Sequence, residues 1–137
     1  MKLITEEWLK KANEDLMVVR EIIDKEHLTN IIAFHSQQAV EKTLKAVIEE
    51  SELQFIKTHN LETLFGTIEN QFDFDVNLGL LKRLDNIYIS ARYPSDLGLL
   101  PSGKPSIEEV KEMYEFAKDL HDQTRRILEN TQCSHDQ

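Results

Sequence analysis

Helix-breaking residues are confined to one short segment of this 137-residue chain, and this restricts its possible folds more than any other feature. All three prolines and two of the four glycines lie between residues 94 and 105. Proline and glycine are the residues that most often end helices, so the remaining sequence favours long uninterrupted elements. Residues 94–105 themselves predict one long loop, a feature that is often functional in a domain of this size.

Apolar residues outside that loop recur every three or four positions, which is the spacing of amphipathic helices. The pattern predicts four long helices at about residues 8–23, 30–50, 80–91 and 107–130, and a short one at 61–68. Asn60 is the expected N-cap of the short helix, and Ser106 with Glu109 matches a capping box. Neither strand alternation nor an internal repeat is present. The sequence therefore predicts an all-α fold, an antiparallel up-and-down helical bundle of four long helices plus a short one.

Length and charge limit the classes of protein to which the chain can belong. Its 16.0 kDa fit a single domain, which we expect to span residues 1–130, followed by a disordered polar tail at 131–137. The net charge of −9 makes broad, nonspecific nucleic-acid binding unfavourable, so a site for a nucleotide or RNA must be compact. The single cysteine, Cys133, excludes an internal disulfide and a zinc site built on cysteines.

The sequence shows neither a membrane-spanning nor a secretory pattern. No apolar run approaches the roughly 20 residues that cross a bilayer, and the first residues lack the apolar core of a signal peptide. We therefore expect a cytoplasmic protein without a membrane partner.

A polar and basic strip runs along the second predicted helix. At about 100° per residue, four side chains fall within a sector of about 80° at the edge of its apolar face: His35, Gln38, Lys42 and Lys45. One interpretation is a solvated helix edge, which is the usual role of charged strips. The other is a site at which these residues bind the phosphate of a nucleotide or RNA.

Gln37 and Glu41 differ from this strip because both point into the apolar sector of the same helix, one turn apart. A buried polar group without a partner costs on the order of 1–3 kcal/mol, so both side chains need partners. Two roles are open for them: a structural hydrogen-bond network or dimer seam, and a part of a functional site.

A second group of candidates, residues 92–96, ends the fourth predicted helix. Arg92 lies at a helix C-terminus, where the helix dipole favours a cation. Alternatively, Arg92 projects into a cleft under the long loop and binds a phosphate or carboxylate bidentately, with Glu41 as the acidic residue that positions it. Tyr93 either stacks on a base or packs against its neighbours, and Asp96 either caps a turn or belongs to the binding site.

His59 and Asn60 precede the short helix. Capping by Asn60 explains this pair without a further function, whereas free amides at the helix N-terminus would let His59 help to bind an anion. The five histidines show neither the HxxxH nor the HExxH spacing of metal sites, so we expect no metal and no cofactor. His121 lies beside the apolar stripe of the last helix, which predicts a packed core histidine.

Three motifs together resemble the HEPN domain family, whose name stands for higher eukaryotes and prokaryotes nucleotide-binding. They are residues 34–42 (FHSQQAVEK) followed by Leu44-Lys45-Ala46, then residues 59–64 (HNLETL), and then residues 91–96 (ARYPSD). The motifs occur in the family's order and spacing, and the resemblance covers the chain from residue 6 to residue 129.

The resemblance implies a helical bundle that forms a homodimer and has a minimal nucleotidyltransferase as partner, the pair acting as a toxin–antitoxin module. For many members it also implies a ribonuclease, whose signature is an arginine followed four to six residues later by a histidine. By position, Arg92 matches the arginine and Glu41 a possible acidic positioner. The chain departs from the signature because residues 96–98 are Asp, Leu and Gly, so no histidine stands there as general acid or base.

Three functions stay open. The favoured one is a homodimeric nucleotide- or RNA-binding module that uses Arg92, Lys42 and Lys45 beside a nucleotidyltransferase. The second is a metal-independent ribonuclease toxin, in which Arg92 stabilises the developing charge and His35 or His59, outside the signature, transfers the proton. The third is a structural or antitoxin-like interaction protein, in which the buried amide and carboxylate of the second helix build a dimer seam.

Overall fold

The helices begin and end close to where the apolar pattern and the caps predict them. The computed structural model describes the backbone of residues 1–92 and 104–135, and the side chains of residues 1–87 and 104–130. Its elements are α1 (Leu3–Ile22), the short 3-10 helix η1 (Glu26–Leu28), α2 (Thr29–Glu50), α3 (Leu61–Ile68), α4 (Leu78–Arg92) and α5 (Ile107–His135). No strand occurs among these residues, so the predicted all-α class is confirmed.

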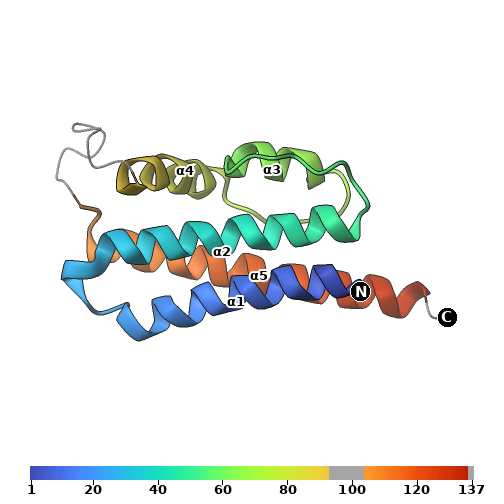
Figure 1. Cartoon of the computed structure of the whole chain (residues 1–137), viewed down its shortest axis with the longest axis horizontal. Coiled ribbons are helices and arrows are strands. Elements are labelled where there is room, and N and C mark those ends of the chain that lie inside the picture. Colours follow the sequence, from blue (N-terminus) through green and yellow to red (C-terminus); the bar gives the residue numbers. More distant parts are fainter. Residues whose placement is uncertain (93–103, 136–137) are drawn as a thin grey trace.

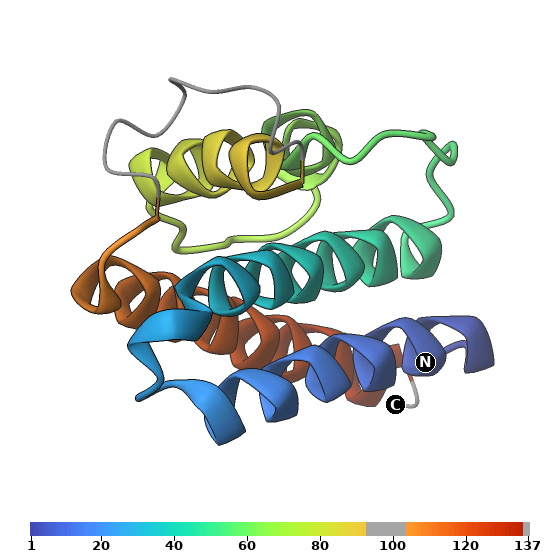
Figure 2. The same cartoon turned by 60° about the vertical axis from the view of Figure 1, so that its left-hand side comes forward.

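The helices form an antiparallel bundle around α2. In Figure 1, α1 and α2 lie side by side and run in opposite directions, with α5 behind them. α3 and α4 follow one another along the other side of α2, and Figure 2 shows the same layer from a second direction. α2 contacts every other helix, which makes it the centre of the bundle. The predicted up-and-down bundle is therefore confirmed.

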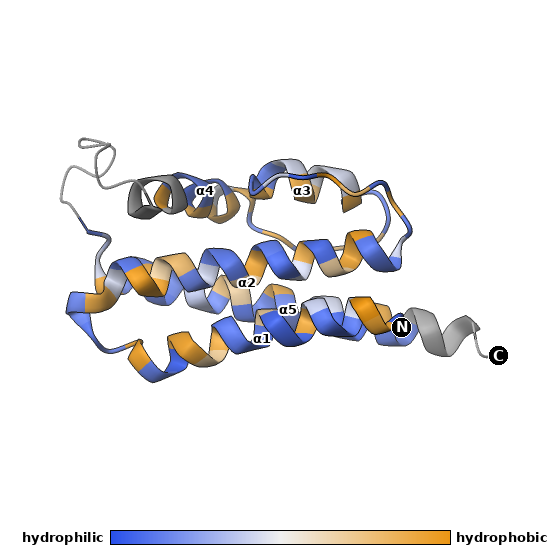
Figure 3. Ribbon diagram, viewed as in Figure 1, coloured by the Kyte–Doolittle hydropathy of each residue, from blue (hydrophilic) through white to orange (hydrophobic). Residues whose placement is uncertain are grey.

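The core lies between α2 and the helices around it. In Figure 3, the apolar stretches of α3 lie on the side that faces α2. All five α-helices contribute fully buried side chains, the largest of which are Leu9, Leu16, Ile32, Leu44, Leu61, Leu64, Ile68, Leu81, Leu84, Met113, Leu120 and Leu128. Burial of one such side chain stabilises the fold by about 1.5–3 kcal/mol, so the apolar stripes fix how the helices pack.

Two helix starts are held by the side chains that the sequence singles out. The N-cap prediction for Asn60 is confirmed, because its Oδ1 accepts a hydrogen bond of 2.8 Å from the backbone N–H of Thr63. The predicted capping box is also confirmed. Ser106 Oγ accepts from the N–H of Glu109 at 3.1 Å, and the Glu109 carboxylate accepts from the N–H of Ser106 at 3.3 Å.

The last helix is longer than its apolar stripe. The helical backbone of α5 runs to His135, into the segment 131–137 for which the sequence predicts a disordered tail. A polar composition does not by itself end a helix, and no proline or glycine lies after residue 105 to do so.

Candidate functional site

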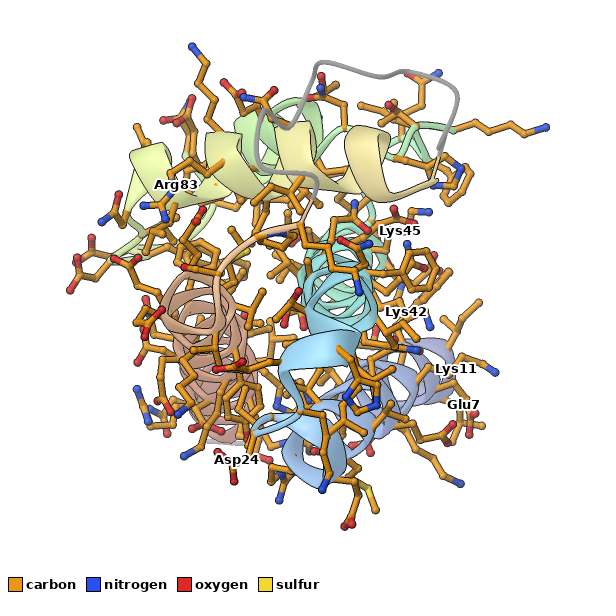
Figure 4. All side chains as sticks on the ribbon, turned by 90° about the vertical axis from the view of Figure 1, so that its left-hand side faces the viewer. Glu7, Lys11, Asp24, Lys42, Lys45 and Arg83 are labelled. Atoms are coloured by element: carbon orange, nitrogen blue, oxygen red, sulfur yellow. The ribbon has the colours of Figure 1, made fainter. Side chains whose placement is uncertain are left out.

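The polar strip of α2 is held by tertiary contacts and is more than a solvated helix edge. Figure 4 shows Lys42 and Lys45 on the side of the molecule where α1 carries Glu7 and Lys11, away from Arg83 of α4. Each of the two lysines of α2 forms an ion pair with a buried carboxylate. Lys42 and His35 contact a carboxylate of α1, whereas the ion pair of Lys45 lies within α2, so the strip takes part in the packing between elements through its first half.

One of these carboxylates joins α1 to α2. The side chain of Asp15, on α1, is only 9% exposed. Its Oδ1 lies 2.7 Å from Nδ1 of His35, and its Oδ2 accepts a hydrogen bond of 2.7 Å from Nζ of Lys42. A carboxylate only accepts hydrogen bonds, so Nδ1 of His35 is the donor. Asp15, His35 and Lys42 are hereafter the Asp15 triad.

The second carboxylate lies further along α2. The side chain of Glu41 is 5% exposed, and its Oε2 accepts a hydrogen bond of 2.9 Å from Nζ of Lys45. Nδ1 of His59 lies 3.0 Å from Oε1 and 3.2 Å from Oε2 of the same carboxylate. Glu41, His59 and Lys45 are hereafter the Glu41 triad. Nζ of Lys45 also lies 5.6 Å and 6.0 Å from the ring centroids of Trp8 and Phe55, within the range of cation–π attraction.

Gln37 connects the parts of the Glu41 triad. Its Nε2 donates to the main-chain oxygen of His59 at 3.2 Å and to Oε1 of Glu41 at 3.5 Å. Its Oε1 accepts a hydrogen bond of 2.8 Å from Nε2 of Gln38. Gln37 and Glu41 are both buried, as predicted, and both have the partners that burial requires. A structural network therefore exists, and it holds side chains of the predicted site.

A third buried carboxylate, that of Asp85 on α4, closes the N-terminus of α3. Its Oδ1 accepts from the N–H of Leu61 at 2.8 Å and its Oδ2 from the N–H of Glu62 at 3.2 Å. Burial raises the pKa of Asp85; the two N–H donors act in the opposite direction, and the charges of Glu62 and Glu41 add to the increase. Together with the Asn60 cap, these bonds occupy the first amides of α3, which favours capping over an anion site.

His121 of α5 lies outside this site. It is buried, and its Nε2 donates a hydrogen bond of 3.0 Å to the carbonyl of Leu9. Burial lowers the pKa of His121, the carbonyl acts in the opposite direction, and the charge of Arg125 adds to the decrease. The predicted packed core histidine is therefore confirmed.

Neither a metal cluster nor a membrane span occurs in the part of the chain that the structure describes. Within it, no group of three or more His, Cys, Asp or Glu side chains is placed to hold a metal ion. No helix of that part combines the length and the apolar character that crossing a bilayer requires.

Three predicted site residues cannot be placed fully. Arg92 is the last residue of α4, but its side chain lies outside the described residues, as do Tyr93 and Asp96. The expected contact between Arg92 and Glu41 lies outside them as well. Among the described side chains, Glu41 binds Gln37 and the two other members of its triad.

Sequence reasoning missed Asp15 and Asp85. Each is an acidic residue set in the apolar stripe of its helix: Asp15 follows Ala12 by three positions and precedes Val19 by four, and Asp85 follows Leu81 by four. This is the same signal that singles out Glu41, a charged side chain in an apolar sector, and it was available on α1 and α4.

Comparison with known proteins places this arrangement in context. The family model of the HEPN domain matches residues 5–127. The crystal structure of TT1696 from Thermus thermophilus has a TM-score of 0.72 and 23% identity, over 89% of this chain and 96% of that chain. The crystal structure of ST0689, an archaeal HEPN homologue, has a TM-score of 0.67 and 22% identity, over 91% of this chain and 97% of that chain. At these identities the two structures show a shared fold alone. No curated protein sequence matches the chain.

Proposed function

Because this chain belongs to the HEPN domain family, we propose that it acts as a homodimeric nucleotide- or RNA-binding module beside a minimal nucleotidyltransferase, in a toxin–antitoxin-type pair. The family resemblance suggests the class of ligand and the partner. The side chains of the two triads suggest how this particular chain would bind the ligand.

The observation that carries the proposal is the row of cationic side chains that the two triads hold along α2. Among the described residues, Lys42 and Lys45 each donate one hydrogen bond to a carboxylate, and an ammonium group has three N–H donors. The other donors can bind phosphate oxygens. The carboxylates already fix the two side chains, which reduces the entropy lost on binding. Arg92, at the end of α4, is the third cation of the proposed site.

Apolar residues exposed on and near α1 support the homodimer. Two copies with a net charge of −9 repel one another at long range, so a stable contact between them must come from apolar area. Ile4 and Phe55 expose half of their surface or more, and Ile4 and Trp8 line a shallow pocket with Glu7 and Lys11. Light scattering should give twice the 16.0 kDa mass of one chain, and a monomer at micromolar concentration would contradict the dimer.

Titration of a fluorescent single-stranded RNA tests the binding role. We expect the double variant Lys42→Gln/Lys45→Gln to bind about 10-fold more weakly at low salt and to show a shallower dependence of affinity on salt. Lys111→Gln/Lys118→Gln is the matched control, because it removes the same two charges from exposed positions on α5. Unchanged affinity in the double variant and in Arg92→Ala would contradict the proposed site.

Co-purification tests the partner. Tagged wild-type protein, co-expressed with each minimal nucleotidyltransferase of its own genome, should retain one of them through purification. If none is retained, the nucleotidyltransferase is removed from the proposal and the binding role stands on the titration alone.

A metal-independent ribonuclease is the second candidate function, and the contact between His59 and Glu41 favours it. The family signature lacks its histidine here, and His59 is a histidine elsewhere in the chain whose ring a carboxylate holds. In this function, Arg92 would stabilise the charge that develops on the phosphorus centre. Purified protein is incubated with RNA, with magnesium or with a chelator. Cleavage that vanishes in Arg92→Ala supports the candidate, and no cleavage contradicts it.

A further inference from the structure

We infer that the shallow pocket beside Trp8 binds a guanine base of the RNA whose phosphates Lys42 and Lys45 bind. The inference rests on the proposed binding function and adds to it a preference for one base, because contacts to phosphate are the same for every sequence. It also gives a role to Glu7 and Lys11, two charged residues of α1 that the proposed function does not use.

The pocket lies on the face of α1 that continues to the Asp15 triad. Its volume is about 210 Å³, and four side chains of α1 line it: Ile4, Glu7, Trp8 and Lys11. Asp15 lies four positions after Lys11 and seven after Trp8, so it shares their face of the helix. Asp15 in turn binds Lys42 of α2. The pocket therefore lies on the side of the molecule where Figure 4 shows the two lysines of α2.

Trp8 supplies the stacking surface and links the pocket to Lys45. Trp8 lines the pocket, and Nζ of Lys45 lies 5.6 Å from the centroid of its indole ring. Bases of single-stranded RNA stack on aromatic side chains, while neighbouring cationic groups bind the backbone. One sugar joins a base to its phosphate, so a base that stacks on Trp8 has its phosphate within reach of Lys45.

Glu7 and Lys11 supply charged groups that a base edge can use. They lie four positions apart on α1 and carry opposite charges, a spacing at which such side chains often pair. Both are exposed, and neither side chain has a hydrogen-bond or ion-pair partner among the described residues. The carboxylate and the ammonium group therefore both remain available to a ligand in the pocket.

Guanine is the base whose edge matches this pair of charges. Its N1–H and its N2 amino group are adjacent donors, and one carboxylate can accept from both. Its O6 and N7 accept hydrogen bonds from an ammonium group. Adenine and cytosine have a ring nitrogen lone pair where guanine has the N1–H, and uracil has a single N–H between two carbonyls. Only guanine offers two adjacent donors to Glu7.

A second copy of the chain is the competing occupant of the pocket. The exposed apolar residues that support the homodimer include Ile4, which also lines the pocket. The centre of a protein interface is depleted of charged residues, whereas a base edge requires polar partners. The charges of Glu7 and Lys11 therefore favour the base, and the experiment must separate the two occupants.

Two five-nucleotide RNAs that differ only in the central base, UUGUU and UUAUU, test the inference at low salt. Their phosphates are identical, so the lysines contribute equally and the difference in affinity reports the base. Both carry 2′-O-methyl riboses, which prevent cleavage through the 2′-hydroxyl. Trp8 is the only tryptophan of the chain, so its fluorescence reports the pocket. We expect UUGUU to bind about 10-fold more tightly than UUAUU and to quench this fluorescence more strongly.

Glu7→Gln tests the base edge without disturbing the core, because Glu7 is exposed. Its amide keeps one acceptor and adds a donor, so the preference for UUGUU should fall from about 10-fold to about 2-fold or less. Glu21→Gln is the matched control, because it removes the same charge from an exposed position further along α1. This control should keep the wild-type preference.

Two replacements of Trp8 test the stacking surface, with calorimetry as the measure of affinity. Trp8→Leu should bind UUGUU about 10-fold more weakly, because the stacking contact is lost. Trp8→Phe should retain most of the affinity, because a phenyl ring still stacks. The urea midpoints of both variants show whether the fold is intact, and Glu7→Gln tests the inference even if Trp8→Leu unfolds.

Four outcomes would contradict parts of this account. Wild type that binds both RNAs equally overturns the inference and leaves the binding function intact. A preference for UUGUU that Glu7→Gln retains also overturns it. Tryptophan fluorescence that changes on dilution of the protein, but not on addition of RNA, assigns the pocket to a second copy and overturns the inference as well. Wild type that binds neither RNA contradicts the proposed function itself.

Discussion

The Asp15 triad and the Glu41 triad combine the same three groups, a buried carboxylate, a histidine and a lysine, in two different ways. In the Asp15 triad, α1 provides the carboxylate and α2 both partners, so the contacts join two long helices. In the Glu41 triad, carboxylate and lysine lie one turn apart on α2, and the histidine comes from the segment before α3.

The two triads also distribute their burial differently. In the Asp15 triad, histidine and lysine are exposed to nearly the same extent, about a quarter of each side chain. In the Glu41 triad, the lysine is 11% exposed and the histidine 61%. The Glu41 triad therefore combines a buried carboxylate and a mostly buried lysine with an exposed imidazole, whereas both partners of Asp15 are exposed to the same extent.

Removal of each carboxylate should show the largest difference between the triads. We expect Glu41→Ala to lower the free energy of unfolding by about 3 kcal/mol, because Lys45 would remain as a mostly buried ammonium. Asp15→Ala should cost about 1–2 kcal/mol, because Lys42 and His35 can turn toward water. Urea unfolding measures both values. Equal losses, or a larger loss in Asp15→Ala, would mean that burial does not set the order.

Gln37→Leu tests the support that only the Glu41 triad has. We expect a loss of about 1–2 kcal/mol, because the main-chain oxygen of His59 and the amide of Gln38 each lose a hydrogen-bond partner. Urea unfolding gives the stability, light scattering gives the oligomeric state, and RNA titration gives the affinity. Higher stability with unchanged oligomeric state and RNA affinity would show that Gln37 has no specific role.

Asp85→Asn tests the carboxylate that closes α3 beside the Glu41 triad. Near neutral pH we expect the free energy of unfolding to fall by about 1 kcal/mol. One of the two N–H donors of α3 would then face the NH₂ group of the asparagine instead of a carboxylate oxygen.

The same variant has a pH signature with a definite sign. Burial raises the pKa of Asp85 in the folded protein above the unfolded value of about 3.9. At pH values between these two pKa values, Asp85 is protonated in the folded state and has released its proton in the unfolded state. The free energy of unfolding therefore falls as pH rises through this window, and Asp85→Asn lacks that fall. Urea titrations of both proteins across the window, at equal ionic strength, check the prediction; parallel pH profiles would refute it.

Removal of the histidines should give the smallest effects, in the opposite order to the carboxylates. We expect His35→Gln to cost up to about 1 kcal/mol and His59→Gln to stay within about 0.5 kcal/mol of wild type, because His59 is the more exposed. Thermal unfolding at neutral pH ranks the two variants. A larger loss of stability in His59→Gln than in His35→Gln would show that the contact between His59 and Glu41 mainly stabilises the fold.

The fold could be predicted from the sequence because its signals are local. The confinement of proline and glycine, the apolar spacing and the Asn60 and Ser106 caps act over a few residues, and they specify helices wherever the chain lies in space. The burial of Gln37 and Glu41 was predictable for the same reason, since one turn of a helix fixes which side chains share a face.

The partners of those side chains were not predictable from local pattern. Asp15 meets His35 and Lys42 across 20 and 27 residues of sequence, and His59 reaches Glu41 across 18. Such contacts depend on how α1 and the segment before α3 lie against α2, which apolar spacing does not specify.

The sequence by itself determined the helices, their caps and the amphipathic face of α2, because helix geometry relates residues three and four positions apart. Only the tertiary structure decided which carboxylate holds which histidine. It also decided that the side chain of His59 is more exposed than that of His35, because burial arises from the packing of elements that are distant in the chain.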